Sequence, residues 1–216
     1  MTDATSSLLD GRTARANARR EKRRAEVLRL AVETFSERGY HRTRVADIIE
    51  AAQIARGTFY LYFDSKNAIF LELLDNLLAE FRRGVVGVDT EPGSAPVVQQ
   101  LIETVSLILK TAASNAALTR IILREAVGLD ADVDDKLSAF YDRLHSYLER
   151  SLENGQEMGL LREMDTGVIA SCILGSVRQV LYRGLVRGDA ETFEVPKLAR
   201  EIVMYNTVGL LRVRQP

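Results

Sequence analysis

Apolar residues recur along most of the chain with the spacing of an α-helix. Positions three and four apart lie on one face of a helix and form a buried stripe when they are apolar. Runs of strictly alternating apolar and polar residues, which are typical of strands, are missing, and the chain has only four prolines. The sequence therefore predicts an all-α fold, as illustrated by two apolar series: Val27, Leu28, Ala31, Val32, Phe35, and Leu137, Phe140, Tyr141, Leu144, Leu148, Leu152.

Residues that favour helix ends divide this pattern into elements. Gly39 is expected to cap the first helix in the left-handed conformation, Thr43 to cap the second, and Gln53 to occupy a left-handed turn. A Gly- and Pro-rich stretch at 84–96 interrupts the helical pattern. We expect helices near residues 19–38, 43–51, 55–62, 65–83, 96–113, 115–128, 132–157, 165–187 and 196–213.

Composition narrows the class of protein. With 46% hydrophobic and 27% charged residues, the chain has the composition of a globular protein with a buried core. Its single Cys, Cys172, excludes a disulfide framework, and two His residues, His41 and His145, make a histidine metal site improbable. The longest apolar stretch, Val168 to Val177, is about half of a membrane-spanning length. We expect a cytoplasmic protein without a membrane segment, metal or cofactor.

The charge is distributed unevenly along the chain. Residues 1–66 carry 13 Lys and Arg against 9 Asp and Glu, whereas residues 67–216 carry 16 against 21. Seven positive charges and one negative charge lie between Arg12 and Arg24. Such a segment suits the phosphate backbone of a nucleic acid, and a solvated tail without a partner is the alternative. We expect residues 1–18 to form a flexible basic arm.

Two short helices joined by a tight turn follow this arm, and they are the components of a helix-turn-helix. The run from Thr58 to Phe63 places four aromatic residues within five positions. At helical spacing, Phe59 and Phe63 can face inward while Tyr60 and Tyr62 direct their hydroxyls outward. An ordinary corner between two helices would have the same length, but this aromatic run favours a unit that presents its second helix to DNA.

From Arg24 to Phe70 the sequence resembles the DNA-binding domain of the tetracycline-repressor (TetR) family of bacterial transcription regulators. The resemblance covers about 47 of the 216 residues by motif. The remainder is similar only in length and all-α pattern. The matching residues are Ala31, Phe35, Gly39-Tyr40, Thr43, Val45-Ala46-Asp47-Ile48, the run Arg56-Gly57-Thr58-Phe59-Tyr60-Leu61-Tyr62-Phe63, and Ser65-Lys66.

The resemblance implies a DNA-contacting role for nine residues. A guanidinium matches the O6 and N7 acceptors of guanine, so Arg56 is the expected reader of a guanine base. The resemblance places Gly57, Thr58 and Leu61 beside it, facing base edges. The expected phosphate contacts are Thr43, Arg44, Tyr60, Tyr62 and Lys66.

The resemblance also implies that residues 67–216 form a helical ligand-binding and dimerisation domain, after a helix-turn-helix domain at 19–66. Its last two helices would form the interface of a homodimer. We expect the effector to be a small, largely apolar molecule. Aromatic residues at helical spacing are more often core than pocket, and the candidates are Phe140, Tyr141, Tyr147, Arg178, Tyr182 and Tyr205.

The expected function is that of a ligand-responsive transcription regulator, a repressor that binds a near-palindromic stretch of double-stranded operator DNA. No hydrolase triad spacing, metalloprotease motif or phosphate-binding glycine loop occurs in the chain, so we expect no enzyme activity. The alternative is an all-α ligand-binding protein or enzyme that kept the fold without specific DNA binding.

Overall fold

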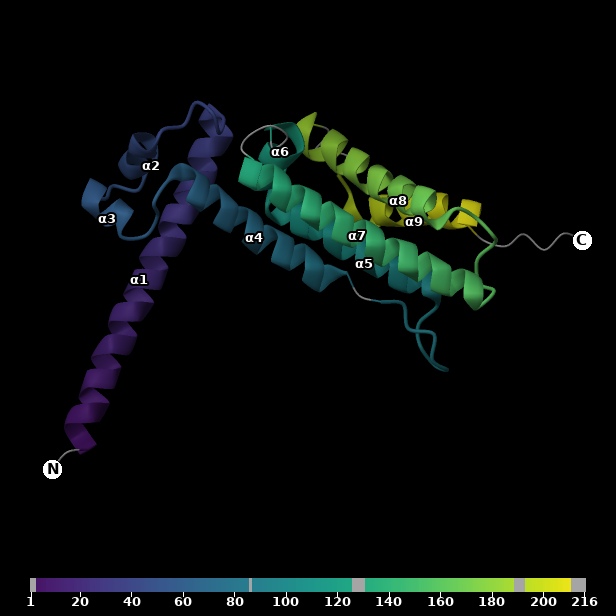
Figure 1. The fold of residues 1–216 in the computed structure, drawn as a ribbon, viewed down its shortest axis with the longest axis horizontal. Helices are drawn as coiled ribbons and strands as arrows, with labels where there is room; N and C mark the ends of the chain where they lie inside the picture. Colours follow the sequence, from purple (N-terminus) through teal and green to yellow (C-terminus); the bar gives the residue numbers. More distant parts are fainter. Residues whose placement is uncertain (1–2, 86, 126–130, 189–192, 211–216) are drawn as a thin grey trace, which may run out of the picture. The chain divides into compact units, whose positions relative to one another are not determined.

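The computed structural model describes residues 3–85, 87–125, 131–188 and 193–210 (Figure 1). Its regular elements are helical, which confirms the predicted all-α fold class. They are α1 (Asp3–Arg38), α2 (Val45–Ala51), α3 (Arg56–Tyr60), α4 (Lys66–Gly84), α5 (Val97–Ser114), α6 (Ala116–Glu125), α7 (Ala131–Glu157), α8 (Thr166–Leu181), the π-helical turn η1 (Tyr182–Val186) and α9 (Val195–Leu210).

The chain folds as two compact units, Met1–Leu73 and Leu74–Pro216. The boundary falls inside α4, whereas we expected the DNA-binding domain to end at residue 66. The reason is that Ile69 and Phe70, in the first turns of α4, are fully buried in the core of the first unit. The helix continues without interruption into the second unit.

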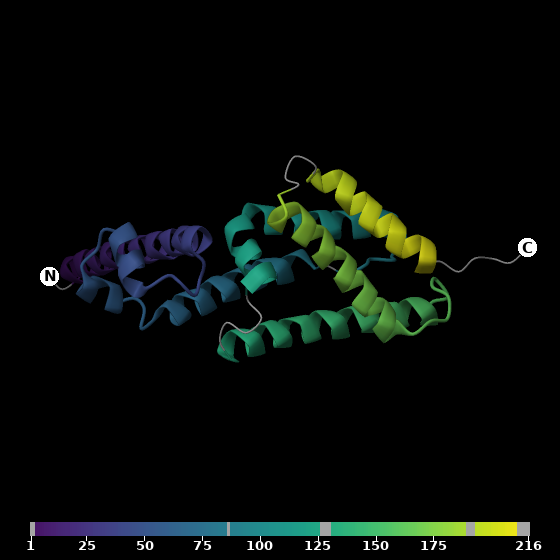
Figure 2. The same ribbon diagram turned by 90° about the horizontal axis from the view of Figure 1, so that it is seen from above.

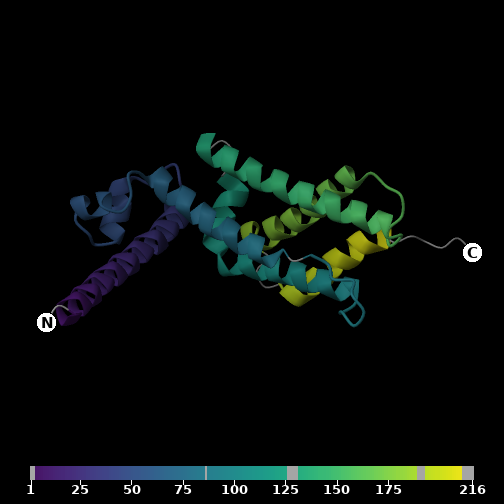
Figure 3. The ribbon, with the colours of Figure 1, turned by 60° about the horizontal axis from the view of Figure 1, so that its bottom comes forward.

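In the first unit α2 packs against α1 and α3 packs against α2 (Figure 3). The beginning of α4 meets the C-terminal half of α1 through the rings of Phe70 and Phe35. Three aromatic rings form the centre of this core. The ring of Tyr40 lies 5.1 Å from that of Phe35 and 4.9 Å from that of Phe70, between centroids. The other buried side chains include Val27, Ala31, Ile48, Phe59, Phe63 and Ile69.

Two turns adopt the left-handed conformation expected from the sequence. Gly39 has a φ of 80° and its amide donates to the carbonyl of Phe35, which ends α1. Gln53 has a φ of 49° in the turn between α2 and α3. A residue with a Cβ costs roughly 1–2 kcal/mol in this conformation. The tight geometry of the turn is therefore maintained by the packing around it.

The expected start of the first helix is wrong. We predicted a helix from about Arg19 with residues 1–18 as a flexible arm, but α1 is helical from Asp3. The physical reason lies in composition: the segment has no proline, and Gly11 is the only strong helix breaker in it. Ala, Arg and Leu, which favour helices, make up much of the remainder.

The second unit is a bundle in which α5 packs on α9 and α7 packs on α8, with α8 also against α9 (Figure 2). One buried cluster lies between α5, α8, η1 and α9, and it contains Leu109, Ala112, Leu181, Leu185, Ala199 and Ile202. A second cluster joins α7 to α8 through Leu152 and Ala170. The predicted helix ends at residues 126–128 and 211–213 lie outside the described residues.

A test of length and hydropathy on the described helices finds no single helix that could cross a membrane. Helices α5 and α6 pass the test only when they are taken together, and a bend of 94° separates them.

Candidate nucleic-acid interface

Helix α3 has one buried face and one exposed face. Phe59 is fully buried, and it fixes the helix to the core of the first unit. Arg56 and Gly57 are exposed at the start of the helix, and Leu61, directly after its end, is 71% exposed. An added Cβ at Gly57 would meet no atom of the chain within 4 Å, so its backbone is open to a partner. The predicted base-contacting residues are thus brought together on one exposed surface.

The aromatic residues after Arg56 orient the exposed cations. The Arg56 guanidinium carbon lies 5.8 Å from the centroid of the Tyr60 ring, one helical turn away. The Arg20 guanidinium lies 6.0 Å from the Tyr62 ring, and it donates to the carbonyl of Leu61 at 3.5 Å. Cation–π contacts of this kind hold a side chain near a ring with about 0.5–1 kcal/mol at exposed sites.

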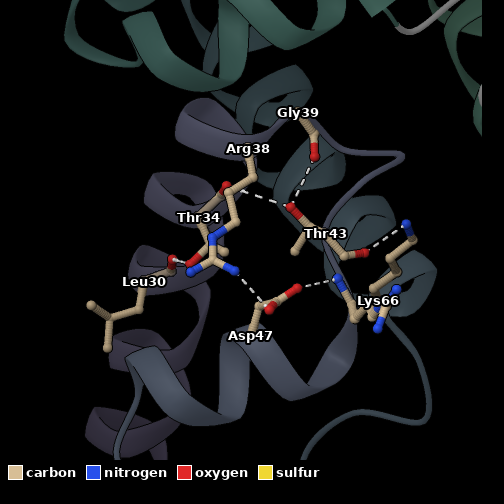
Figure 4. A network of polar contacts seen from close by, with 8 residues as sticks. Leu30, Thr34, Arg38, Gly39, Thr43, Asp47 and Lys66 are labelled. Carbon is tan, nitrogen blue, oxygen red and sulfur yellow. Dashed lines mark hydrogen bonds and ion pairs between the residues drawn. The ribbon is translucent and has the colours of Figure 1, made fainter.

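Asp47 organises the start of α2. Its carboxylate accepts from the backbone N–H of Arg44 at 2.7 Å and from the side chain of Arg38 at 2.7 Å (Figure 4). A carboxylate near a helix N-terminus also interacts favourably with the helix dipole. The carboxylate therefore fixes the backbone of Arg44, and the Arg44 side chain is exposed. Sequence reasoning missed this role of Asp47, although an acidic residue in the first turn of a helix signals it.

Thr43 differs from the prediction in two ways. Arg44, not Thr43, is the N-cap residue of α2. The Thr43 side chain is only 1% exposed, and its hydroxyl donates to the carbonyl of Gly39 at 2.8 Å (Figure 4). We therefore correct the expected phosphate contact of the Thr43 side chain. Its hydroxyl satisfies the end of α1 because Tyr40 packs into the core and turns the loop inward.

Lys66, the first residue of α4, contacts the loop that joins α1 to α2. Its ammonium donates to the carbonyls of Tyr40 at 2.8 Å, His41 at 3.2 Å and Thr43 at 2.9 Å. It also lies 4.5 Å from the centroid of the Tyr40 ring. Burial lowers the pKa of Lys66. An ammonium has three donors, and all three are used within the chain. Lys66 therefore ties α4 to the loop before α2, and its expected phosphate contact stays a prediction.

Three of the candidate ligand-binding residues lie near one another in the second unit. Phe140 is buried, and its ring centroid lies 6.4 Å from that of Phe81. Burial raises the pKa of the adjacent Tyr141, and the positive charge of Arg178 opposes part of this rise. The charge of Arg178 in α8 therefore acts on the hydroxyl of Tyr141 in α7.

The other three candidates lie apart from this group. Tyr182 lines a half-open cavity of about 430 Å³ with Gln179, Arg183 and Arg187. The hydroxyl of Tyr147 lies beside Gly87. Tyr205 is 79% exposed on α9, so it is not part of the buried core, and its expected ligand contact stays a prediction. An exposed aromatic ring on the last helix is instead suited to an interface between protein chains.

Within the part of the chain that the structure describes, no group of three His, Cys, Asp or Glu residues is placed to hold a metal ion. A short exposed helix, fixed by an aromatic core behind a tight turn and followed by a separate helical bundle, defines the class of helix-turn-helix DNA-binding proteins.

Two family models match the chain along both units. Residues 27–73 match the model described as bacterial regulatory proteins, tetR family. Residues 94–182 match the model described as tetracyclin repressor-like, C-terminal domain. The chain belongs to the TetR family of transcription regulators.

Individual relatives agree with this assignment. The nucleoid occlusion factor SlmA of Pasteurella multocida is 31% identical over 146 residues, which cover 66% of this chain and 70% of that protein. The transcriptional repressor DhaR of Mycobacterium sp. (strain GP1) is 24% identical over 172 residues, with 79% and 86% covered. A solved structure of a TetR-family regulator from Syntrophomonas wolfei has a TM-score of 0.69 at 27% identity, covering 90% of this chain and 99% of that one.

These comparisons confirm the predicted family, fold class and function as a DNA-binding transcription regulator. The relatives are named as regulators and not as enzymes. The alternative of a ligand-binding protein or enzyme that lost DNA binding is not favoured.

Proposed function

We propose that this protein is a homodimeric repressor that binds a near-palindromic operator and is released by a small molecule. The observation that carries the proposal is the exposed surface of α3, on which Arg56, Gly57 and Leu61 are unobstructed while Phe59 is fully buried. A helix of this kind enters the major groove, which is wide enough to admit it. Since α3 has only five residues, one copy reads a few base pairs, and two copies are needed for useful specificity.

Each exposed residue has a chemistry that suits one kind of DNA contact. Arg56 reads guanine through a bidentate pair of hydrogen bonds, and Leu61 contacts a thymine methyl group. Thr58 offers either a hydroxyl or a methyl to the neighbouring base. Arg44 and Tyr60 contact phosphates on either side of the groove and set the position of α3 without reading sequence.

Sequence selection tests this reading. The protein is incubated with a pool of random DNA duplexes, and the bound fraction is sequenced. We expect an inverted repeat. Arg56→Ala should cost about 1–3 kcal/mol and relax the preference at one position in each half-site. The control is Arg29→Ala, which removes an exposed cation of α1 that pairs with Glu33 at 2.6 Å. A bound pool without a repeat, or an unchanged preference in Arg56→Ala, contradicts the proposal.

We propose that α8 and α9 form the dimer interface. The exposed surfaces of these helices carry large apolar side chains, with Val168 56%, Met204 42% and Tyr205 79% exposed. The two helices are joined by the side-chain amide of Asn206, which donates to the hydroxyl of Ser176 at 3.2 Å. Exposed apolar groups of this kind mark sites of protein association.

Tyr205→Glu tests the interface, because it would place two carboxylates in a desolvated contact. Sedimentation velocity should show a monomer, and affinity for the full repeat should fall toward that for a half-site. Lys110→Glu, a charge reversal at an exposed position of α5, should remain dimeric. A dimeric Tyr205→Glu variant would refute this interface.

The effector is proposed to bind within residues 84–216 and to be largely apolar with one polar group. The observations that support this are the contact between the ring of buried Phe140 and that of half-buried Phe81, and the charge of Arg178, which acts on the buried hydroxyl of Tyr141. An apolar wall with a single polar anchor is the common form of a small-molecule site.

A thermal-shift screen of lipophilic carboxylic acids and drugs, followed by operator titration with each hit, tests this. Coupling between effector and operator is expected to change affinity about five- to 150-fold. Tight binders that leave operator affinity unchanged would exclude release by an effector, since a ligand with equal affinity for both states shifts nothing.

A further inference from the structure

Helix α1 extends far beyond the core that it helps to form (Figure 1). It begins at Asp3, and the first buried side chain among those described in it is Val27. At about 1.5 Å per residue, the intervening turns span roughly 35 Å. A helical segment that buries no apolar stripe gains little stability from tertiary packing, and isolated helices are marginal in water. Between Arg15 and Glu26 no described side chain of the helix is buried, so packing within the chain does not account for this length.

The charge of this segment is strongly positive, with seven Lys and Arg between Arg12 and Arg24 against Glu21 alone. Where side chains are described, Arg19, Arg20, Lys22 and Arg23 are all exposed. Positions 12, 15, 19, 22 and 23 recur every three or four residues, so they lie on one face of the helix.

These cations line an open groove of about 880 Å³ in the first unit. Its walls are Arg19, Arg20, Lys22, Arg23 and Glu26 from α1, and Thr58, Leu61 and Tyr62 from α3 and the turn after it. The single carboxylate in the groove, that of Glu26, pairs with Arg23 at 3.0 Å. The bond from Arg20 to the carbonyl of Leu61 holds the two walls together.

Thr58 and Leu61 belong both to this groove and to the exposed surface of α3 that faces DNA. A duplex that binds to α3 therefore lies beside the open side of this groove. From Arg15 to Arg23 the basic face is about 12 Å long. Since each strand of a duplex carries one phosphate per roughly 3.4 Å, this length corresponds to about three or four phosphates. A row of cations matches a linear polyanion better than a compact anion.

We propose that the basic face of α1 from Arg15 to Arg23 is a second DNA-binding surface, which holds the phosphate backbone that flanks the base pairs read by α3. The inference rests on the proposed operator binding and adds to it a longer footprint. The contacts are made to phosphates, so they are independent of sequence, and they become weaker as salt is raised.

Two duplexes that share the selected inverted repeat test the proposal. One ends at the outermost base pair of the repeat, and the other continues for about ten base pairs on each side, a length that one helical turn of DNA provides. We compare the full-length wild type with Arg19→Ala/Lys22→Ala/Arg23→Ala. The control, Arg29→Ala/Arg82→Ala/Arg83→Ala, removes the same charge at exposed positions outside the groove.

The wild type and the control should bind the long duplex at least tenfold more tightly than the short one. Their plots of log affinity against log salt should be steeper on the long duplex by about 0.9 for each added phosphate contact. The groove variant should lose both differences while it retains the sequence preference of the repeat. Circular dichroism should show that its fold is unchanged, because the three side chains are exposed.

Equal wild-type affinity for the two duplexes overturns the second surface, and so does an equal loss in the control. In both cases selective binding to the repeat persists, and the proposed function stands. Failure of the wild type to prefer the repeat in either duplex overturns the proposed function as well, so the two failures are distinguishable.

Discussion

Replacing Lys66 with methionine tests whether this side chain stabilises the loop before α2 or contacts DNA. Methionine retains a flexible apolar stem of similar length but removes the ammonium. The carbonyls of Tyr40, His41 and Thr43 then lose the donor that lies 2.8–3.2 Å from them. The loop that they form leads directly into α2, so the change acts on the entry to the helix-turn-helix.

The size of the effect follows from these contacts. A hydrogen bond to a charged donor contributes about 1.5–3 kcal/mol when it is buried, and about 0.5–1 when water can replace the donor. Lys66 is half-buried, so three bonds at the lower value predict roughly 2 kcal/mol of lost stability in the first unit. With a urea m-value of about 1–2 kcal/mol/M, the midpoint of unfolding should fall by about 1–2 M.

Urea unfolding followed by circular dichroism at 222 nm measures this loss, and hydrogen exchange should locate it in residues 39–47. Under folding conditions, the variant should keep the salt dependence of operator binding. A phosphate contact at Lys66 would instead lower the slope by about 0.9 per subunit. Arg44→Met, which removes an exposed cation at the start of α2, is the matched control: it should lower the salt slope and leave the stability unchanged. A Lys66→Met variant of unchanged stability and lower salt slope would refute the role of Lys66 in stabilising the loop before α2.

Three other changes test separate contacts. Thr43→Val should lower the free energy of unfolding by about 1–2 kcal/mol in chemical denaturation, because the carbonyl of Gly39 loses a buried hydrogen-bond donor. The operator sequence preference should not change. A loss of operator affinity at unchanged stability would contradict this. Gly184→Ala should lower the free energy of unfolding by about 1–3 kcal/mol, since the new Cβ would lie 2.2 Å from the Phe193 ring. Gly57→Ala is the control: this position has open space around it, so the Tm should not fall. Burial raises the pKa of the Tyr141 hydroxyl, so its neutral form stabilises the fold below about pH 10, and this contribution is lost as pH rises through the raised pKa. Tyr141→Phe should therefore lose less stability at alkaline pH than the wild type, and equal losses would contradict this assignment.

The periodic apolar pattern and the turn residues were sufficient to predict the helices and the tight turn between α2 and α3. Local rules govern these features: Gly39 adopts a left-handed conformation because it lacks a Cβ, and Phe59 is buried while Arg56 and Gly57 are exposed because a helix repeats every 3.6 residues. The exposed side of α3 follows from the same repeat. The expected break between an arm and the first helix failed because absence of a core stripe does not prevent good helix formers from continuing a helix.

The roles of Thr43 and Lys66 were decided by tertiary structure. Both residues carry polar groups that suit a phosphate, and nothing in their sequence neighbourhood excludes such a contact. Packing of Tyr40 between Phe35 and Phe70 turns the loop so that the Thr43 hydroxyl is buried and three carbonyls converge on the Lys66 ammonium. Convergence of groups 23 to 26 residues apart depends on long-range packing. The sequence by itself determined which helices form and which α3 side chains face outward, whereas only the folded core brought the Thr43 hydroxyl and the Lys66 ammonium into contact with backbone carbonyls.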